Sequence, residues 1–261
     1  MNKLVSRLYT GIIMLVFGFV VIFSESRLLL FINIWILSSL AIIEVSNCIS
    51  PKKDKFNNIQ LLVLNCILNI FGYIGNINAF IGAFAFSIML SFIGSMPDTG
   101  KKDRDPSTVL FSLTYVSFLF CFSYFYPENT QSYLFIALLV SWGTDSFAYT
   151  VGSVIGKRHF STISPNKTLE GSIGGLIGSM ALCLLAGLYF PELSKEFLLI
   201  VGLVGSIFSQ LGDLFASSLK RKHNLKDFSK LLNAHGGIMD RFDSVIFAIP
   251  TVWCFLKLFK I

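Results

Sequence analysis

Four polar residues near the end of the chain are spaced three, four and three positions apart: Gln210, Asp213, Ser217 and Lys220. On a helix, this spacing places all four side chains on one face. The stretch that contains them, from Phe197 to Leu219, is otherwise apolar and predicts a membrane-spanning helix. Because polar groups are unfavourable in lipid, this face must lie against protein, water or a ligand.

A second carboxylate, Asp145, lies inside an apolar run from Tyr133 to Ile155. With a rise of about 1.5 Å per residue, Asp145 lies roughly 18 Å and Asp213 roughly 24 Å from the outer ends of their runs. Both therefore approach the same edge of a hydrocarbon core about 30 Å thick, where parallel helices could place them side by side. Each aspartate suits either a structural ion pair or cap bond, or a place in an active site.

The segment that follows, residues 217–244, is rich in charge and glycine and reads SSLKRKHNLKDFSKLLNAHGGIMDRFDS. Carboxylates suit Mg²⁺, which takes a few of them together with waters and phosphate oxygens. Lysine and arginine neutralise phosphate charge, which is the main task of a phosphoryl-transfer catalyst. Glycines carry no side chain and let the backbone approach phosphates closely. These residue types together suit the transfer of a nucleotidyl group between phosphate oxygens.

This segment resembles the signature of the phosphatidate cytidylyltransferase (CDP-diglyceride synthetase) family. The match runs over residues 217–243, and the one departure is Asn233, where the family has Pro or Gly. Asparagine also suits turns and left-handed backbone. Two further stretches, Gln210–Leu214 and Ser164–Gly171, look like blocks of the same family. The resemblance is specific from about Ser141 to Ser244.

The resemblance implies an enzyme that transfers CMP from CTP to phosphatidic acid in a lipid bilayer, with Mg²⁺ as cofactor, and gives CDP-diacylglycerol and pyrophosphate. The candidate catalytic residues are Asp213, Asp240, Lys220, Arg221, Lys226 and Arg241. The candidate substrate-binding residues are Asp145, Lys167, Glu170, Ser217, His235, Gly236 and Gly237. The candidate metal ligands are Asp213, Asp240 and Asp243, although Asp243 also suits the N-cap of the last span.

Other functions remain open on the sequence alone. Another CTP-dependent lipid enzyme, such as a polyprenol kinase or an ether-lipid cytidylyltransferase, would differ in a lipid tail that no motif identifies. A secondary transporter would show broken helices and polar residues in both halves, whereas polar groups here gather in one half. The sequence leaves a homodimer open. Its basic loops are typical of membrane topology rather than of nucleic-acid binding.

The composition predicts the elements that must position these residues. Of 261 residues, 54% are hydrophobic and 14% are charged, whereas a soluble domain has about 25% charged residues. We therefore predict an all-α, polytopic transmembrane bundle of about nine spans. The runs are Tyr9 to Phe23, Leu28 to Val45, Ile59 to Ile74, Ile77 to Met96, Val109 to Tyr126, Tyr133 to Ile155, Gly171 to Phe190, Phe197 to Leu219, and Ser244 to Phe259.

The chain changes character about half-way. We predict N-terminal membrane helices over residues 1–130 and catalytic membrane helices over 131–261, with a cytoplasmic motif loop at 220–243. No motif in the first part could be attached to chemistry. In the second part, glycines four residues apart predict close helix packing: Gly171 with Gly175, and Gly174 with Gly178.

Charge predicts the orientation. Seventeen of the 21 lysine and arginine residues fall at the N-terminus and in alternate loops. The positive-inside rule places these segments in the cytoplasm and the C-terminus outside. We therefore predict a multi-pass protein of the cell membrane, the cytoplasmic membrane of a bacterium, with a cytoplasmic N-terminus.

Overall fold

The computed structural model describes residues 22–50, 55–95, 106–126, 133–159, 163–232 and 236–260. Seven helices in these parts of the chain are long and apolar enough to cross a membrane, and Val245–Leu258 is a shorter apolar helix. This confirms the all-α, polytopic class. The run predicted from Tyr9 to Phe23 lies almost entirely outside the described residues, so the count of nine stays a prediction.

The helix bounds lie close to the predicted runs. One span is interrupted: it consists of α5 (Pro106–Ser112), the π-helical turn η1 (Leu113–Phe118), α6 (Leu119–Cys121) and the 3₁₀ turn η2 (Phe122–Phe125). The others are α2 (Arg27–Ile49), α3 (Lys55–Ile74), α4 (Ile77–Gly94), α7 (Tyr133–Ile155), α8 (Leu169–Ala186), α9 (Lys195–Lys222), α10 (Met239–Phe242) and α11 (Val245–Leu258).

Local sequence sets where several helices begin. A Ser, Thr or Asn side chain at an N-cap accepts a bond from a backbone N–H that has no partner inside the helix. In α2 the cap is Ser26, in α4 Asn76, in α8 Thr168 and in α9 Ser194. Thr168 matters most for the site, because it fixes the start of α8 directly after Lys167.

The chain forms two compact units. The first comprises Met1–Pro127 with Asp227–Met239, and the second comprises Glu128–Lys226 with Asp240–Ile261. Part of the signature segment, residues 227–239, therefore belongs with the N-terminal helices. The predicted catalytic role of residues 131–261 is not tested by this division and stays a prediction.

The first unit contains a buried polar network between its helices. Asn65 Nδ2 donates to Ser39 Oγ at 2.9 Å, and Ser117 Oγ donates to Asn65 Oδ1 at 2.6 Å. Tyr124 Oη donates to Asn69 Oδ1 at 2.7 Å. These bonds join α2 and α3 to the interrupted span, in which η1 supplies Ser117 and η2 supplies Tyr124. Buried polar groups need such partners, so the network fixes how these apolar helices pack.

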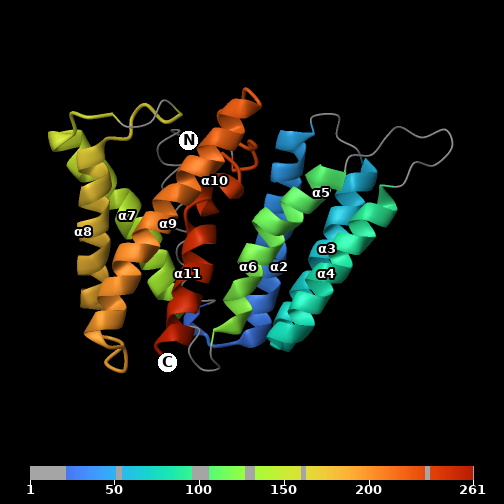
Figure 1. Ribbon diagram of the computed structural model, residues 1–261, viewed down its shortest axis with the longest axis horizontal. Helices are drawn as coiled ribbons and strands as arrows, with labels where there is room; N and C mark the ends of the chain where they lie inside the picture. The colour runs from blue at the N-terminus through green and yellow to red at the C-terminus, as the bar shows by residue number, and fades with distance from the viewer. Residues whose placement is uncertain are drawn as a thin grey trace, which may run out of the picture. The chain divides into compact units, whose positions relative to one another are not determined.

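In the second unit, α7 packs against α8, α9 and α11, and α9 packs against α8 and α11 (Figure 1). Two of the predicted small residues lie where α7 and α8 approach closely. A Cβ at Gly171 would lie 2.7 Å from the carbonyl oxygen of Ala148, and one at Gly175 would lie 2.9 Å from that of Thr144. The glycine spacing is therefore confirmed as a packing feature.

Candidate active site

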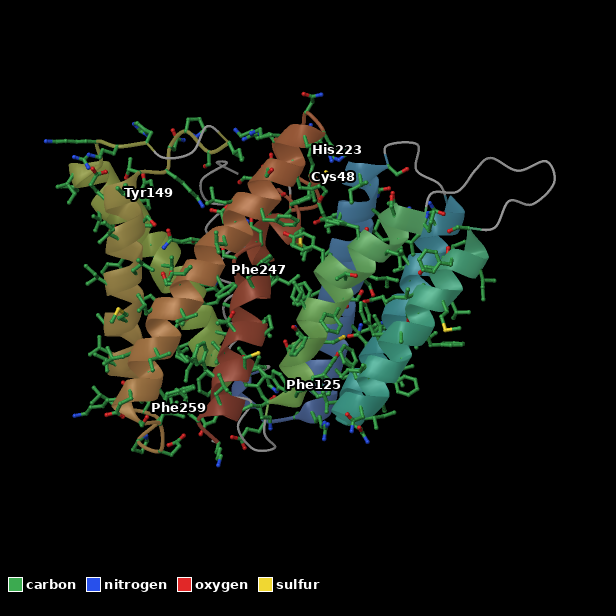
Figure 2. The ribbon with its side chains drawn as sticks, viewed as in Figure 1. Cys48, Phe125, Tyr149, His223, Phe247 and Phe259 are labelled. Carbon is green, nitrogen blue, oxygen red and sulfur yellow. The ribbon has the colours of Figure 1, made fainter. Side chains whose placement is uncertain are left out.

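A cavity of about 240 Å³ opens in the second unit. It is smaller than a pocket that encloses a drug-sized ligand, for which about 300–1,000 Å³ is usual, so it can hold a phosphate group or part of a nucleotide. Its lining comes from α7, α8, α9 and the loop before α8: Asp145, Ala148, Tyr149, Asn166, Lys167, Thr168, Gly171, Ser172, Gln210 and Asp213. Tyr149, labelled in Figure 2, is 79% exposed on α7.

An ion pair lies in this cavity. Lys167 Nζ is 2.6 Å from Asp213 Oδ2, and the two side chains are 25% and 27% exposed. Asp145 lines the same cavity, so the two intramembrane aspartates lie in one place, as their matching depths predicted. The cavity thus combines two carboxylates with one lysine that is open to exchange partners with a ligand.

The polar face of α9 has a partner at each position. Gln210 bonds with Ser172 of α8 through Oε1, which accepts from the serine Oγ, and through Nε2, which donates to the serine carbonyl at 3.3 Å. Ser217 Oγ donates to Asp213 Oδ1 at 3.3 Å. Lys220 pairs with the carboxylate of Asp240. As predicted, this face lies against protein rather than lipid at Gln210 and Lys220.

A third carboxylate, Asp243, lies close to the first two. Ser244 Oγ lies 3.3 Å from Asp145 Oδ2 and 3.4 Å from Asp243 Oδ1, so it links both. Burial raises the pKa of the Asp243 carboxyl to about 7, and the negative charge of Asp213 adds to the increase. The carboxylates of Asp145, Asp213 and Asp243 thus lie near one another beside Lys167, and such a group of acidic side chains suits a cation.

Glycine at position 212 permits this arrangement. A Cβ there would lie 2.6 Å from the carbonyl oxygen of Asp243 and 2.9 Å from the ring of Phe247. The rings of Phe215 and Phe247, the latter labelled in Figure 2, have centroids 6.2 Å apart. The close contact of α9 with the start of α11 brings Asp213 toward Asp243.

A second ion pair joins α9 to α10. Lys220 Nζ donates to Asp240 Oδ1 at 2.7 Å, and it lies 3.9 Å from Asp243 Oδ2. The side chains of Lys220 and Asp240 are only 10% and 6% exposed. Asp240 does not line the cavity, and its carboxylate is occupied by lysine. Among the described residues, no group of three His, Cys, Asp or Glu side chains is arranged to hold a metal ion.

The loop before α8 has its own internal supports. Glu170 Oε2 accepts from the backbone N–H groups of Lys157 and Arg158 at 3.1 and 3.2 Å, and Leu169 N–H donates to the Arg158 carbonyl at 2.8 Å. The structure thus uses Glu170 to fold the loop, whereas Lys167 of the same loop points to Asp213. A substrate contact of Glu170 stays a prediction.

Arg221, Lys226 and Arg241 are not among the residues that line the cavity. Arg221 is exposed and donates to the Leu225 carbonyl at 2.8 Å. Lys226 and Arg241 are exposed as well. Gly236 and Gly237 belong to the first unit, and His235 lies outside the described residues. Whether these residues contact substrate stays a prediction.

The cavity also includes residues that the sequence prediction did not assign to the site: Tyr149, Asn166 and Ser172, together with Gln210 in its bond to Ser172. Asn166 lay in a block that resembles the family, and Gln210 lay on the polar face of α9, so signals existed for both. A glutamate of the first half, Glu44, was missed as well. Its signal was a carboxylate within the apolar run from Leu28 to Val45.

Comparisons with known proteins decide the family. A model of the cytidylyltransferase family matches residues 5–259, which is nearly the whole chain. This chain belongs to the cytidylyltransferase family. Membership confirms the resemblance seen in the signature segment and the prediction that the chain is a nucleotidyltransferase.

Curated relatives agree with this membership. A protein of Bacillus subtilis (strain 168), named phosphatidate cytidylyltransferase, is 38% identical over 190 residues, which is 69% of this chain and 68% of the relative. Proteins of the same name from Staphylococcus aureus (strain COL) and Staphylococcus haemolyticus (strain JCSC1435) are both 41% identical over 170 residues, which is 62% of this chain and 65% of each relative. The chain thus matches about two thirds of their length.

Proposed function

We propose that this chain is a phosphatidate cytidylyltransferase, which transfers CMP from CTP to phosphatidic acid. The observation that carries the proposal is the cavity in which Lys167 pairs with Asp213 beside Asp145. The lysine can bind phosphate, and the carboxylates can bind a cation that accompanies a triphosphate. The names of the curated relatives support the same activity.

The reaction needs charge neutralisation more than proton transfer. A phosphate oxygen of phosphatidic acid forms a bond to the α-phosphorus of CTP, and the bond from that phosphorus to the β-phosphate oxygen breaks. Pyrophosphate leaves with the electron pair. The attacking phosphate monoester is already ionised near pH 7, so no strong general base is required, and positive groups stabilise the developing charge.

We propose roles from the contacts that the described residues make. Lys167 binds a phosphate oxygen. Ser217 orients Asp213 by donating to its carboxylate, and Asp145 lines the same cavity. Lys220 holds Asp240 and lies near Asp243. The remaining residues proposed to approach the triphosphate or pyrophosphate are Arg221, Lys226, Glu170, His235, Gly236, Gly237 and Arg241.

The donor set fits Mg²⁺, which we propose as the cofactor. Mg²⁺ takes one or two carboxylates and otherwise keeps waters and phosphate oxygens, so Asp213 and Asp243 suffice, while lysine holds Asp240. The closeness of Asp145, Asp213 and Asp243 favours such an ion. When bound, the ion would neutralise phosphate charge and orient the triphosphate.

We further propose a multi-pass location in the cytoplasmic membrane of a bacterium, with the N-terminus in the cytoplasm. Phosphatidic acid would enter from the inner leaflet and CTP from the cytoplasm. We also propose a homodimer, which the molar mass of the protein in detergent, measured by light scattering, would test.

The decisive experiment uses purified protein, phosphatidic acid, Mg²⁺ and CTP labelled at either the α- or the γ-phosphorus. We expect α-label in the lipid product and γ-label in pyrophosphate. Transfer of γ-label to lipid, with release of CDP, would identify a lipid kinase instead. An Asp213→Asn variant that inserts normally but transfers neither label to lipid would tie the activity to the cavity.

A further inference from the structure

Glu44 is a buried carboxylate in the apolar helix α2. It is the only acidic residue of that helix, and it is 6% exposed. A charge in such a position is unfavourable unless several donors satisfy it. The donors around Glu44 therefore indicate what the residue does.

Three donors among the described residues bond with this carboxylate, and all of them come from the signature segment, almost two hundred residues later in the chain. Ser229 Oγ donates to Glu44 Oε1 at 2.6 Å, and the Ile238 N–H donates to the same oxygen at 3.0 Å. The Met239 N–H donates to Oε2 at 2.8 Å. The glutamate and its donors lie in the same compact unit. Two consecutive backbone amides directed at one anion form an anion-binding concavity.

Gly237 explains why this carboxylate can come so close. A Cβ at that position would lie 2.4 Å from Glu44 Oε2 and 2.6 Å from Oε1, so any side chain would displace the glutamate. The sequence predicted that this glycine lets a phosphate approach the backbone. The anion that the structure places there is the carboxylate of Glu44.

We propose that Glu44 is a positioning residue for the reaction: it fixes two described parts of the signature segment, Ser229 and residues 236–239, in one conformation before substrate arrives. This inference rests on the proposed function, because it assumes that the segment takes part in binding CTP. A segment that is mobile until CTP binds would lose conformational entropy at that moment, which would weaken binding. A carboxylate that accepts charge-assisted bonds from both the start and the end of the segment removes that penalty in advance.

The contact also bears on the residue that follows. Met239 is the first residue of α10, and Asp240 is the next residue of the chain. Consecutive Cα atoms are about 3.8 Å apart, so holding the Met239 amide restricts the backbone that carries Asp240. The glutamate thus acts through backbone and serine contacts, with no contact to the reacting groups required.

The test compares Glu44→Gln with Ser38→Ala. Glutamine keeps the size of the side chain, but it replaces one acceptor oxygen by an NH₂ group that can only donate, so at least one bond to the segment is lost. Ser38 is a buried residue of the same helix that bonds with Asn69, and among the described residues its hydrogen bonds do not involve the signature segment. Ser38→Ala therefore controls for a general loss of packing in α2.

The first readout is amide hydrogen exchange of the peptide that contains Ile238 and Met239, measured in full-length protein without CTP. We expect at least tenfold faster exchange in Glu44→Gln and wild-type exchange in Ser38→Ala. Unchanged exchange in Glu44→Gln would overturn the proposal. This readout does not depend on any activity, so it decides the role of Glu44 even if the proposed reaction fails.

The second readout is steady-state kinetics. We expect Glu44→Gln to raise the KM for CTP at least fivefold and to change kcat less than twofold, with the KM for phosphatidic acid unchanged. The double variant Glu44→Gln, Ser229→Ala should raise the KM for CTP no further than Glu44→Gln alone, because both substitutions disrupt the same contact between Glu44 and Ser229. A lower KM for CTP would mean that the Glu44 carboxylate competes with a phosphate for the backbone amides. An equal effect of Ser38→Ala would mean general destabilisation. Either result refutes positioning.

If Glu44→Gln does not accumulate in the membrane, Ser229→Ala alone should still speed the amide exchange at least twofold, and no change would refute the proposal.

Discussion

The Nζ atom of Lys167 lies 2.6 Å from Oδ2 of Asp213, so a loop cation neutralises a carboxylate of α9 inside the cavity. A substrate phosphate would compete with Asp213 for the lysine, and a metal ion would compete with Lys167 for the aspartate. A triphosphate that arrives with its ion can satisfy both partners at once. The pair therefore neutralises part of the negative charge of the cavity until the substrate enters.

We predict that Lys167→Ala lowers kcat/KM for CTP by more than tenfold, a loss of about 1.4 kcal/mol or more of transition-state stabilisation. The alanine removes the phosphate partner and leaves the charges of Asp145, Asp213 and Asp243 without their lysine. Lys222→Ala is the matched control, since Lys222 is an exposed residue at the end of α9. If a normally inserted Lys167→Ala protein kept the wild-type kcat/KM for CTP, the loop before α8 would serve membrane topology only and would not bind substrate.

Asp213→Asn and Asp240→Asn should each lower turnover at least a hundredfold at saturating CTP, and extra Mg²⁺ should rescue little. Asparagine keeps the size of the side chain and removes the charge that a metal or lysine needs. A Mg²⁺ titration of both variants measures this effect. Near-normal turnover with unchanged Mg²⁺ dependence would show that the substituted aspartate is structural.

The two aspartates should differ in stability. The side chain of Asp213 is 27% exposed, so Asp213→Asn should leave thermal unfolding almost unchanged. The side chain of Asp240 is 6% exposed and is paired with a lysine that is 10% exposed. Removing one partner of a buried pair costs about 3–5 kcal/mol, whereas replacing both is close to neutral.

The double variant Lys220→Met, Asp240→Asn should therefore regain thermal stability lost by Asp240→Asn but remain inactive. Thermal unfolding in detergent measures the first property, and CMP transfer measures the second. Recovery of activity together with stability would mean that the pair serves only the fold.

Much of the second unit could be predicted from sequence, because its signals are local. The spacing of Gln210, Asp213 and Lys220 defines a helix face, and the glycines of α8 define a close contact. The partners of these residues could not be predicted. Lys167 and Glu170 lie three residues apart in one block, yet Lys167 enters the cavity and Glu170 folds its own loop.

The first unit was less predictable for a related reason. Its polar residues are scattered singly in apolar helices, and their importance depends on partners far away in the chain. Asn65 meets Ser117 across 52 positions, and Glu44 meets Met239 across 195. No spacing within one helix reveals such pairs, which arise only when helices pack.

The orientation can be tested with single cysteines in a background without the five native ones. Probes at Lys53, Lys102 and Lys226 should react only from the cytoplasmic side, and probes at Glu128 and the C-terminus only from outside. Lys195 and Lys222 provide a check within one helix, because the ends of α9 lie about 40 Å apart at 1.5 Å per residue. Labelling of Lys102 and Glu128 from the same side would exclude the nine-span topology.

The close contact at Gly212 predicts a specific loss of activity. A methyl group there would lie 2.6 Å from the backbone carbonyl of Asp243, and backbone cannot move aside as a flexible side chain can. Gly212→Ala should therefore push α9 away from the start of α11, separate Asp213 from Asp243, and lower kcat at least tenfold. Alanine favours a helix over glycine by about 1 kcal/mol, so the loss cannot come from helix propensity.

Gly82→Ala in α4 is the matched control, because a Cβ there meets nothing within 4 Å. We expect it to keep wild-type kcat and to unfold at the same or a slightly higher temperature. The two variants add the same methyl group to helical glycines and differ in what that group meets. If Gly212→Ala retained wild-type kcat, the spacing between Asp213 and Asp243 would not matter for turnover, and these two carboxylates would not share one ion.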